Sequence, residues 1–363
     1  MRILHVTDVY RPSLGGIELF VEELAQRQHA AGHDVSVLTR TRDAEALAGP
    51  VAVRRAPATG VLGDIDLTGF DAVHAHLSVW SPTTCRAIGA ASRRGVPVVA
   101  TVHSMWDGWG PAVRLLMPLT GRSPMVWTAV SRAAARDMAA VLGDTPVHVV
   151  PNAVDVAWWG AGERQRRNDV LTLVSVMRLA SRKRPMQLLE LFADLVREVP
   201  DARPRLVVAG DGPFAGPMTE WVRARRLEGR VLLTGPLSRS AIRDLHGVAD
   251  LFVGPAHQES FGIAALEARA AGVPVVAMAS GGVGEFVREG LDGRLCDDDD
   301  AMLETLVQLA RDRSRLAAMQ AHCATVAPEH DWSHALDGFG ACYRRAAATA
   351  RPARLSRLAS PVS

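Results

Sequence analysis

Short apolar runs alternate with helix-like segments along almost the whole sequence, and this alternation restricts the chain to a small group of folds. In the first half, strand-like runs lie at residues 2–7, 34–39, 72–75, 96–101, 125–129 and 147–150. Segments of helical composition fill the gaps between them, for example residues 17–31 and 132–142. Strands that alternate with helices are typical of parallel sheets with helices packed on both faces.

A second series of the same kind follows residues 156–168, whose tryptophan, glycine and arginine content indicates a linker. The strand-like runs of this series lie at residues 171–176, 205–209, 231–233, 251–253 and 275–277. The chain has 363 residues, of which 48% are hydrophobic, and this is enough for two separate cores. We therefore predict an α/β protein with two Rossmann-like doubly wound domains, at residues 1–155 and 169–332, that hold a ligand in the cleft between them.

Composition argues against several other classes of protein. A formal net charge of +2 offers no electrostatic case for nucleic-acid binding. The four cysteines are scattered without a Cys-x-x-Cys pair, which indicates reduced thiols and neither a disulfide framework nor a zinc site. No signal-peptide pattern begins the sequence, and no apolar run reaches the length of a membrane span. We expect a cytoplasmic protein whose contact with a membrane is at most peripheral.

Residues 249–276 carry the most specific pattern in the sequence. A strand-like run leads into Glu259-Ser-Phe-Gly, and a helix-like segment follows at residues 261–271. Such a turn offers free backbone N–H groups and the positive end of the helix dipole to an anion, and Gly262 lets a phosphate approach the backbone closely. Glu259 before the helix and Glu267 within it provide carboxylates for sugar hydroxyls on either side of a diphosphate. The pattern therefore indicates a nucleotide-sugar site.

This segment also resembles a known family. Glu259 and Glu267, with Ser-Phe-Gly after the first and Gly-Val-Pro-Val-Val closing the helix, resemble the Glu-x7-Glu signature of retaining family-4 glycosyltransferases. The resemblance extends over roughly residues 1–345 and implies the GT-B fold. It implies an enzyme that moves a hexosyl group from a UDP- or GDP-sugar to a hydroxyl of a glycan, a lipid or a small metabolite.

Two cations follow the first strand of the second series. Arg178 stands at the end of this strand, and Lys183, the single lysine of the sequence, comes shortly after it. Cations beyond the carboxyl end of a strand face the ligand crevice of an open sheet, where they stabilise negative charge on a leaving diphosphate. The resemblance places catalytic roles on both. The alternative is a solvated basic loop in which Arg182 and Arg184 also take part.

The resemblance assigns further contacts in both halves of the chain. His103, after a strand of the first half, is expected to bond a sugar hydroxyl and completes a catalytic set with Arg178, Lys183 and Glu259. The expected donor and nucleotide contacts are Gly16, Gly210, Asp211, Gly212, Ser260, Phe261, Gly262, Ile263 and Glu267. The expected acceptor contacts are Gly15, Tyr10, Trp106 and Trp109. For the glycines a plain turn, and for the tryptophans a place in the core, remain the alternatives.

The acidic run Asp297–Asp300 is a candidate for a metal site, but it stands directly before a helix-like segment at residues 301–310. Acidic residues at that place are common as helix caps and as partners of the helix dipole. We therefore predict no metal and no other cofactor. The resemblance implies a front-face reaction in which the leaving phosphate oxygen takes the proton of the acceptor, without a dedicated base.

Two other functions stay open on the sequence. One is a nucleotide-sugar epimerase of the same fold, and the other is a non-catalytic nucleotide-sugar-binding protein. The resemblance also implies that a last helix, residues 333–349, crosses back to the N-terminal domain. The composition of residues 350–363 predicts a disordered tail.

Overall fold

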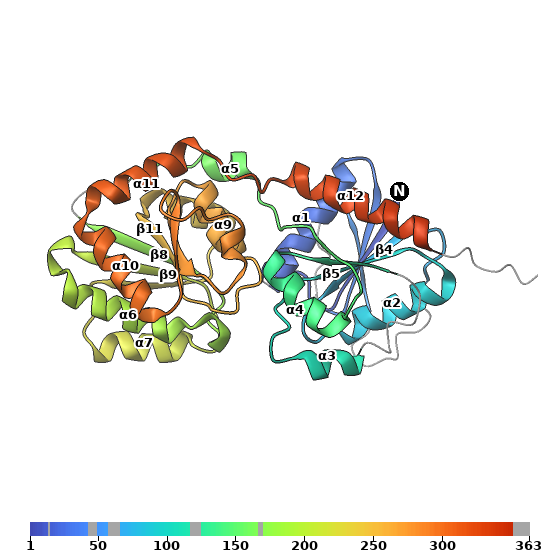
Figure 1. Cartoon of the computed structure of the whole chain (residues 1–363), viewed down its shortest axis with the longest axis horizontal. Coiled ribbons are helices and arrows are strands. Elements are labelled where there is room, and N and C mark those ends of the chain that lie inside the picture. Colours follow the sequence, from blue (N-terminus) through green and yellow to red (C-terminus); the bar gives the residue numbers. More distant parts are fainter. Residues whose placement is uncertain (14, 43–48, 57–65, 117–124, 166–169, 351–363) are drawn as a thin grey trace, which may run out of the picture. The chain divides into compact units, whose positions relative to one another are not determined.

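The structure is a computed structural model that describes residues 1–13, 15–42, 49–56, 66–116, 125–165 and 170–350. The chain forms two compact units (Figure 1). The first unit contains residues 1–130 and 135–150 and the chain from Leu336 onward, and the second contains residues 131–134 and 151–335. Each unit is built around its own sheet.

The first unit is built on a seven-stranded parallel sheet with the order β3-β2-β1-β4-β5-β6-β7. Its strands are β1 (Arg2–Thr7), β2 (Asp34–Thr39), β3 (Ala52–Arg55), β4 (Ala72–Leu77), β5 (Val98–Val102), β6 (Val126–Ala129) and β7 (Val147–Val149). The helices that belong wholly or mostly to this unit are α1 (Gly16–Ala30), α2 (Pro82–Arg94), α3 (Gly110–Leu116), α4 (Arg132–Leu142) and α12 (Trp332–Thr349).

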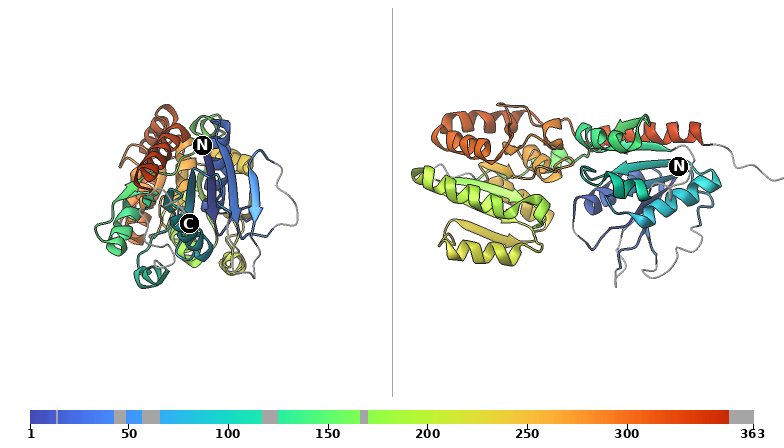
Figure 2. Two further views of the ribbon diagram at one scale, coloured as in Figure 1. Left: turned by 90° about the vertical axis from the view of Figure 1, so that its right-hand side faces the viewer. Right: turned by 60° about the horizontal axis from the view of Figure 1, so that its bottom comes forward.

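The second unit is built on a six-stranded parallel sheet with the order β10-β9-β8-β11-β12-β13. Its strands are β8 (Leu171–Val176), β9 (Pro204–Ala209), β10 (Val231–Gly235), β11 (Leu251–Gly254), β12 (Val275–Met278) and β13 (Gly293–Cys296). Its helices are α5 (Val156–Gly160), α6 (Pro185–Glu198), α7 (Ala215–Ala224), α8 (Arg239–Val248), α9 (Ile263–Ala270), α10 (Asp299–Arg311) and α11 (Arg313–Thr325). In each unit helices cover both faces of the sheet (Figure 2), which confirms the predicted doubly wound arrangement.

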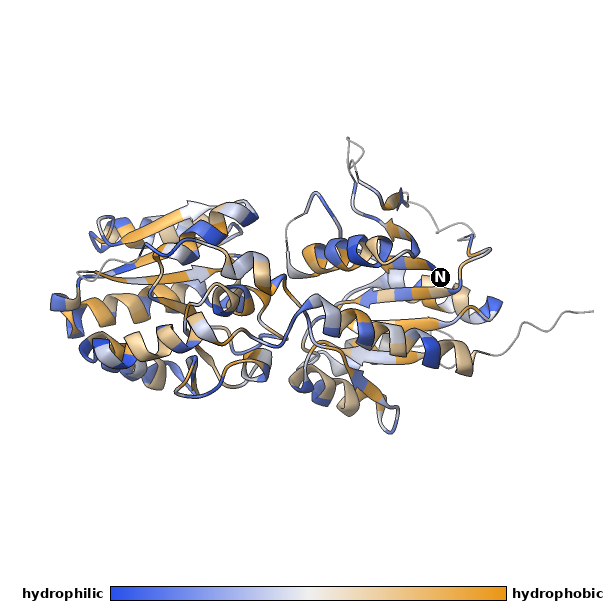
Figure 3. Ribbon diagram, turned by 90° about the horizontal axis from the view of Figure 1, so that it is seen from above, coloured by the Kyte–Doolittle hydropathy of each residue, from blue (hydrophilic) through white to orange (hydrophobic). Residues whose placement is uncertain are grey.

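The cores of both units lie between sheet and helices. Central parallel strands are covered on both faces and are therefore apolar along their whole length. Every residue of β5, Val-Val-Ala-Thr-Val, is buried. In the second unit, Leu189 and Leu195 of α6 join Leu171 of β8 in one hydrophobic cluster. Figure 3 shows the strands coloured mostly as hydrophobic, with hydrophilic residues on the helices.

The structure contains two edge strands that the sequence pattern did not predict. In β3, exposed and half-buried residues alternate, so the strand has no apolar run. The other edge strand, β13, is only four residues long and begins at Gly293. Edge strands pair on one side only and tolerate polar residues. The hydrophobic pattern that revealed the central strands is therefore absent from both.

The prediction of a linker at residues 156–168 is wrong for its first part, which forms helix α5. Asp155 caps this helix by accepting a hydrogen bond from the backbone N–H of Trp158, at 2.9 Å. Trp159 is fully buried. Its neighbour Trp158 stacks against the guanidinium of Arg243, 4.3 Å from the ring centroid. The residues that made the segment look like a linker are thus the ones that dock it on the second unit.

Helix α12 joins the first unit from Leu336 onward. Its Tyr343 is buried, and the hydroxyl accepts a hydrogen bond from Gln28 of α1 at 2.9 Å. The predicted disordered tail spans residues 350–363, of which residues 351–363 lie outside the described residues. Within the described part of the chain, no helix is long and apolar enough to cross a membrane. All four cysteines are buried free thiols.

Candidate functional site

The strand order of the second unit reverses at β8, which pairs with β9 on one side and with β11 on the other. Chain segments leave the carboxyl ends of β8 and β11 in opposite directions, and open α/β sheets bind ligands at such a switch point. The loop after β8 carries Arg178 and Lys183, and the loop after β11 carries Glu259. The topology thus places these three predicted site residues on adjacent loops.

Lys183 and Glu259 form an ion pair at this switch point. The Lys183 Nζ donates to Oε2 of Glu259, and the two side chains are only 18% and 21% exposed. Lys183 ends a short 3₁₀ turn, Ser181–Lys183, that leads into α6. Arg178 is exposed beyond the end of β8. The loop after β8 therefore carries the exposed Arg178 and, in a partly buried ion pair, Lys183.

The two arginines beside Lys183 have different surroundings. Arg184 donates from both terminal nitrogens to the carboxylate of Asp299, at 2.8 and 2.6 Å. This bidentate pair is the main cause of a lowered pKa of Asp299. Asp298 caps α10 by accepting from a backbone N–H of its first turn, at 2.8 Å. Asp298, Asp299 and Arg184 therefore have structural partners, whereas Arg182 is exposed.

The turn after β9 supports the loop that carries Arg178. Gly210 has a φ of +140°, and a Cβ there would lie 1.8 Å from the carbonyl oxygen of Met177. Gly212 has a φ of +153°, and a Cβ there would lie 2.6 Å from the carbonyl oxygen of Leu179. Only glycine fits such close contact at these dihedral angles. The two glycines thus hold the backbone on both sides of Arg178.

A Gly210→Ala substitution is expected to destabilise the second unit by about 3 kcal/mol or more, because it adds a backbone clash to an unfavourable φ. Thermal unfolding followed by circular dichroism measures this change. Gly216→Ala is the matched control, since Gly216 lies in helix α7 with no atom within 4 Å of the added methyl group. Equal melting temperatures for the two variants would contradict the role assigned to Gly210.

The loop between β11 and α9 has a fixed shape. Gly262 adopts a φ of +95°, so the helix starts at Ile263 and not at residue 261 as predicted. Phe261 is 1% exposed and anchors the loop in the core. The backbone of Glu259 accepts a hydrogen bond from the N–H of Gly282, at 2.7 Å. These contacts set the position of the Glu259 carboxylate relative to the start of the helix.

Glu267 lies inside α9 and is partly buried. Burial raises the pKa of its carboxyl group to about 7, and the positive charge of Arg239 opposes this rise. Arg239 begins α8, and its guanidinium lies 5.2 Å from the ring of Trp158. A carboxyl group with a pKa near 7 is partly protonated around neutral pH. It can therefore donate a hydrogen bond as well as accept one.

In the first unit, the loop after β1 leads into α1 at Gly16, with Gly15 as the N-cap residue. The side chain of Glu18 is 7% exposed and lies against Gly15, since a Cβ on this glycine would be 2.5 Å from Glu18 Oε2. A carboxylate favours the positive end of a helix dipole. The carboxylate of Glu18 thus lies at the helix end where Gly16 is predicted to contact the donor and Gly15 the acceptor.

His103 follows β5 and is 7% exposed. Its backbone N–H donates to the carbonyl oxygen of Leu77 at 2.9 Å, and its Nε2 lies 3.0 Å from Nδ1 of His76. Burial lowers the pKa of His103 to about 3, so the ring is neutral at pH 7. A neutral imidazole forms hydrogen bonds without acting as an acid, which is compatible with a contact to a sugar hydroxyl.

Comparison with known proteins matches both units. The sequence model described as "Glycosyltransferase Family 4" matches residues 14–158, and the one described as "Glycosyl transferases group 1" matches residues 162–324. D-inositol 3-phosphate glycosyltransferase 1 of Catenulispora acidiphila is 30% identical over 387 residues, which cover 92% of this chain and 91% of that protein. The chain belongs to glycosyltransferase family 4. The predicted family is thereby confirmed.

Solved structures agree with this family-4 assignment at the level of the fold. HepE of Anabaena in complex with UDP superposes with a TM-score of 0.76 at 18% identity, and covers 95% of this chain and 100% of that one. Sucrose-phosphate synthase from Thermosynechococcus elongatus gives a TM-score of 0.75 at 17% identity over 95% of this chain and 99% of that one. The two Rossmann-like units therefore form a GT-B glycosyltransferase.

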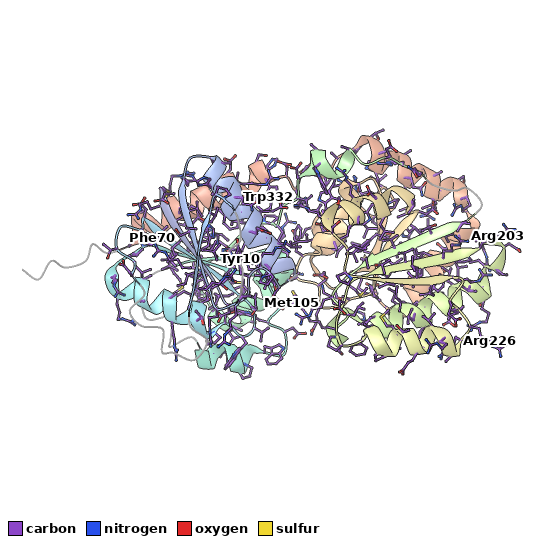
Figure 4. All side chains as sticks on the ribbon, turned by 180° about the vertical axis from the view of Figure 1, so that it is seen from behind. Tyr10, Phe70, Met105, Arg203, Arg226 and Trp332 are labelled. Atoms are coloured by element: carbon purple, nitrogen blue, oxygen red, sulfur yellow. The ribbon has the colours of Figure 1, made fainter. Side chains whose placement is uncertain are left out.

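Two of the acceptor contacts predicted for this glycosyltransferase, Tyr10 and Trp106, are buried in the structure. Tyr10 is 3% exposed and packs with Val21 of α1 in a hydrophobic cluster (Figure 4). Trp106 is also 3% exposed and meets the ring of Trp127 edge-on at 6.3 Å. Both are core residues, because tertiary packing covers them. Trp109 is 53% exposed and stays a candidate for acceptor stacking.

Several pairings between residues that shape the sites of this family-4 enzyme have no signal in the sequence. Arg239 affects Glu267 from another helix, and Asp299 fixes Arg184 from the start of α10. His76 contacts His103 although 27 residues separate the two. No local pattern marks such pairs, because they depend on the order of strands in the sheet.

Proposed function

We propose that this family-4 glycosyltransferase moves a hexosyl group from a nucleoside-diphosphate sugar to an acceptor hydroxyl, with retention of configuration and without a metal. The observation that carries the proposal is the ion pair of Lys183 and Glu259 at the switch point of the second sheet, with Arg178 on the same loop as Lys183. Cations at such a point suit the diphosphate, and the carboxylate suits the hydroxyls of the donor sugar. Structures of HepE with UDP and with UDP-glucose support a donor of this type.

The ion pair gives the donor site a defined starting state. Lys183 and Glu259 neutralise each other before the donor binds. An incoming diphosphate competes with Glu259 for the ammonium group, and the released carboxylate is then available to sugar hydroxyls. Glu267 lies one turn inside α9, and its carboxylate bonds the ribose of the donor. As the bond from C1 to the diphosphate breaks, Arg178 and Lys183 stabilise the growing negative charge, and the leaving oxygen takes the proton of the acceptor.

Thermal unfolding in the presence of UDP, GDP and ADP, each with and without EDTA, tests the donor site. One nucleotide at about a hundred times its dissociation constant should stabilise the protein by about 2.7 kcal/mol. The shift in Tm is expected to be the same with EDTA, because the cations that hold the diphosphate belong to the protein. Absence of a shift with every nucleotide would contradict a nucleotide-sugar donor, and loss of the shift in EDTA would contradict the metal-free site.

The acceptor and the stereochemistry need a separate test. D-inositol 3-phosphate is the first acceptor to test, because several relatives are named D-inositol 3-phosphate glycosyltransferases. The donor in this test is the sugar form of the nucleotide that raises Tm. We expect an acceptor-dependent product whose anomeric proton shows the configuration of the donor by NMR. A product of opposite configuration would contradict retention. Release of nucleotide without an acceptor-linked product would indicate an epimerase.

A further inference from the structure

Aromatic and cationic side chains meet where helices α5, α8 and α9 of the second unit come together. Trp158 and Trp159 of α5 contact each other edge-on, with ring centroids 4.8 Å apart. Two arginines of α8, Arg239 and Arg243, lie one turn apart on the same face of that helix. Their guanidinium carbons are 5.2 and 4.3 Å from the ring centroid of Trp158. Helix α5 also packs against α9, which carries Glu267 (Figure 1).

The place of Arg239 in its helix favours an anion close to it. Arg239 is the first residue of α8, directly after Ser238, which caps the helix by accepting from the N–H of Ala241 at 3.2 Å. The first turn of a helix carries a partial positive charge, so a cation there is more stable beside a carboxylate. The first turn of α8 has no acidic residue of its own. A carboxylate comes from another helix instead, because the charge of Arg239 acts on Glu267 of α9.

The elements packed around α9 are otherwise poor in charge. Helix α5 (Val-Ala-Trp-Trp-Gly) and strands β11 (Leu-Phe-Val-Gly) and β12 (Val-Val-Ala-Met) have no charged side chain. His246 of α8 is buried, and burial lowers its pKa to about 3, so its ring is neutral at pH 7. Such an environment disfavours the ionised form of Glu267, and the charge of Arg239 opposes this effect.

Other cations near these helices have different partners. Arg269 of α9 is 3.0 Å from the carboxylate of Asp292. Arg164 donates to the carbonyl oxygen of Gly272, just after the end of α9, at 3.3 Å. Arg243 donates to the carbonyl oxygen of Trp158, also at 3.3 Å. These three arginines hold elements of the second unit together, whereas the charge of Arg239 is the one that acts on Glu267.

We propose that Arg239, held on the ring of Trp158, is a positioning residue that keeps the carboxylate of Glu267 as an acceptor for the two hydroxyls of the donor ribose. An ionised carboxylate accepts from both hydroxyls, whereas a protonated carboxyl group donates through one of its oxygens. Trp158 takes part because a guanidinium near an aromatic face is attracted to the ring. The contact with the ribose rests on the proposed function, whereas the pairing of Arg239 with Glu267 does not.

Carbon-13 NMR of protein labelled with [δ-¹³C]glutamate tests the pairing directly, because the carboxyl shift follows protonation. Wild-type Glu267 is expected to titrate near pH 7, and the loss of its signal in Glu267→Gln assigns it. Arg239→Met removes the charge from a side chain of similar length and should move the midpoint to a higher pH, and Arg239→Lys should restore it. Arg243→Met is the matched control, since it removes the same charge from the same tryptophan and should not move the midpoint. An unchanged midpoint in folded Arg239→Met would overturn the proposal, and so would equal changes in the two methionine variants.

Calorimetric titration with UDP, or with GDP where GDP is the nucleotide that raises Tm, tests the consequence for the donor. The ionised form of Glu267 binds the ribose, so the affinity is complete above about pH 7 and falls as the pH drops through the midpoint of Glu267. At pH 7, Arg239→Met should bind the nucleotide about fivefold more weakly than the wild type, and at pH 8.5 about equally well. The ratio of the two dissociation constants removes the titration of the nucleotide itself.

The 2′,3′-dideoxy form of the same nucleotide lacks both ribose hydroxyls and separates the ribose from the phosphates. Its affinity at pH 7 should be the same for the wild type and for Arg239→Met. A fivefold difference that persists with the dideoxy nucleotide would show attraction between Arg239 and the phosphates and would refute the positioning role. If no nucleotide binds, the proposed function fails, and the NMR titration still decides whether Arg239 acts on Glu267.

Discussion

Replacement of Lys183 by alanine is expected to lower kcat about 10²- to 10³-fold while the affinity for the donor nucleotide falls less than about tenfold. The negative charge on the leaving diphosphate is larger in the transition state than in the bound donor, so a cation beside it acts mainly on the rate. In the unliganded protein this ammonium already faces Glu259 in a partly buried setting, where charge interactions are stronger than in water. Steady-state kinetics and nucleotide titration of the same variant separate the two quantities.

The matched control for this experiment is Arg182→Ala, which removes the same charge one residue earlier from an exposed side chain. It should keep kcat within about threefold, since exposed charges are screened. Equal losses of turnover and affinity in Lys183→Ala would contradict a role in the transition state. A loss of affinity alone would favour a protein that binds nucleotide sugars without catalysis.

Acidification is expected to destabilise the protein steeply below pH 6.5. Burial lowers the pKa of His5 to about 4 and those of His103 and His246 to about 3, and it holds those of His74 and His76 well below the usual value. The unfolded chain binds these protons near pH 6.5 and the folded chain does not, so the free energy of unfolding falls as the pH falls. Each ring contributes up to about 1.4 kcal/mol per pH unit.

The carboxyl group of Glu267 acts in the opposite direction. The raised pKa of Glu267, about 7, means that the folded state takes up a proton between pH 7 and the usual value of 4.5, which stabilises the fold as the pH falls. For Glu267 and the five rings named above, the net loss is on the order of 5 kcal/mol between pH 6.5 and pH 5. Urea unfolding followed by circular dichroism at pH 7, 6 and 5 measures this loss.

His246 offers a direct check on the cause of the acid sensitivity. Neither of its ring nitrogens has a hydrogen-bond partner among the described residues, and the ring packs 5.8 Å from that of Trp159. His246→Phe should reduce the slope of stability against pH by about one proton, whereas His29→Gln, at an exposed position, should not change it. A stability that is constant from pH 7 to pH 5 would contradict neutral buried rings.

The fold could be predicted because its central elements are encoded locally. Buried parallel strands are continuous apolar runs, and turn residues separate them from the helices, so the two series were visible without any tertiary information. The edge strands β3 and β13 were not predicted. In β3 exposed and half-buried residues alternate, and β13 is only four residues long. Helix α5 was taken for a linker because the burial of Trp159, and not helical periodicity, holds it in place.

The residues of the candidate site also divide into those that the sequence pattern revealed and those that only tertiary packing decided. Arg178, Lys183 and Glu259 stood out in the sequence because they follow strand ends, and the parallel order of β8 and β11 then brings their loops together. Tyr10 and Trp106 have the residue types of a sugar-binding surface, but whether an aromatic ring is covered depends on what packs on it from elsewhere in the chain. Their place in the core was therefore not visible from the sequence.

The amino-acid sequence alone was enough for the family, for the plan of two α/β domains and for Arg178, Lys183 and Glu259 as candidate residues, since each rests on a local pattern in the chain. The pairing of Lys183 with Glu259, the high pKa of Glu267 and the contact of Arg239 with Trp158 come only with the folded units. Gln28 and Tyr343 are 315 residues apart, and His5 meets His76 only because β1 and β4 are neighbours in the sheet. Hydrogen bonds and burial act over a few ångströms, so contacts between distant segments exist only once the sheet order has set them side by side.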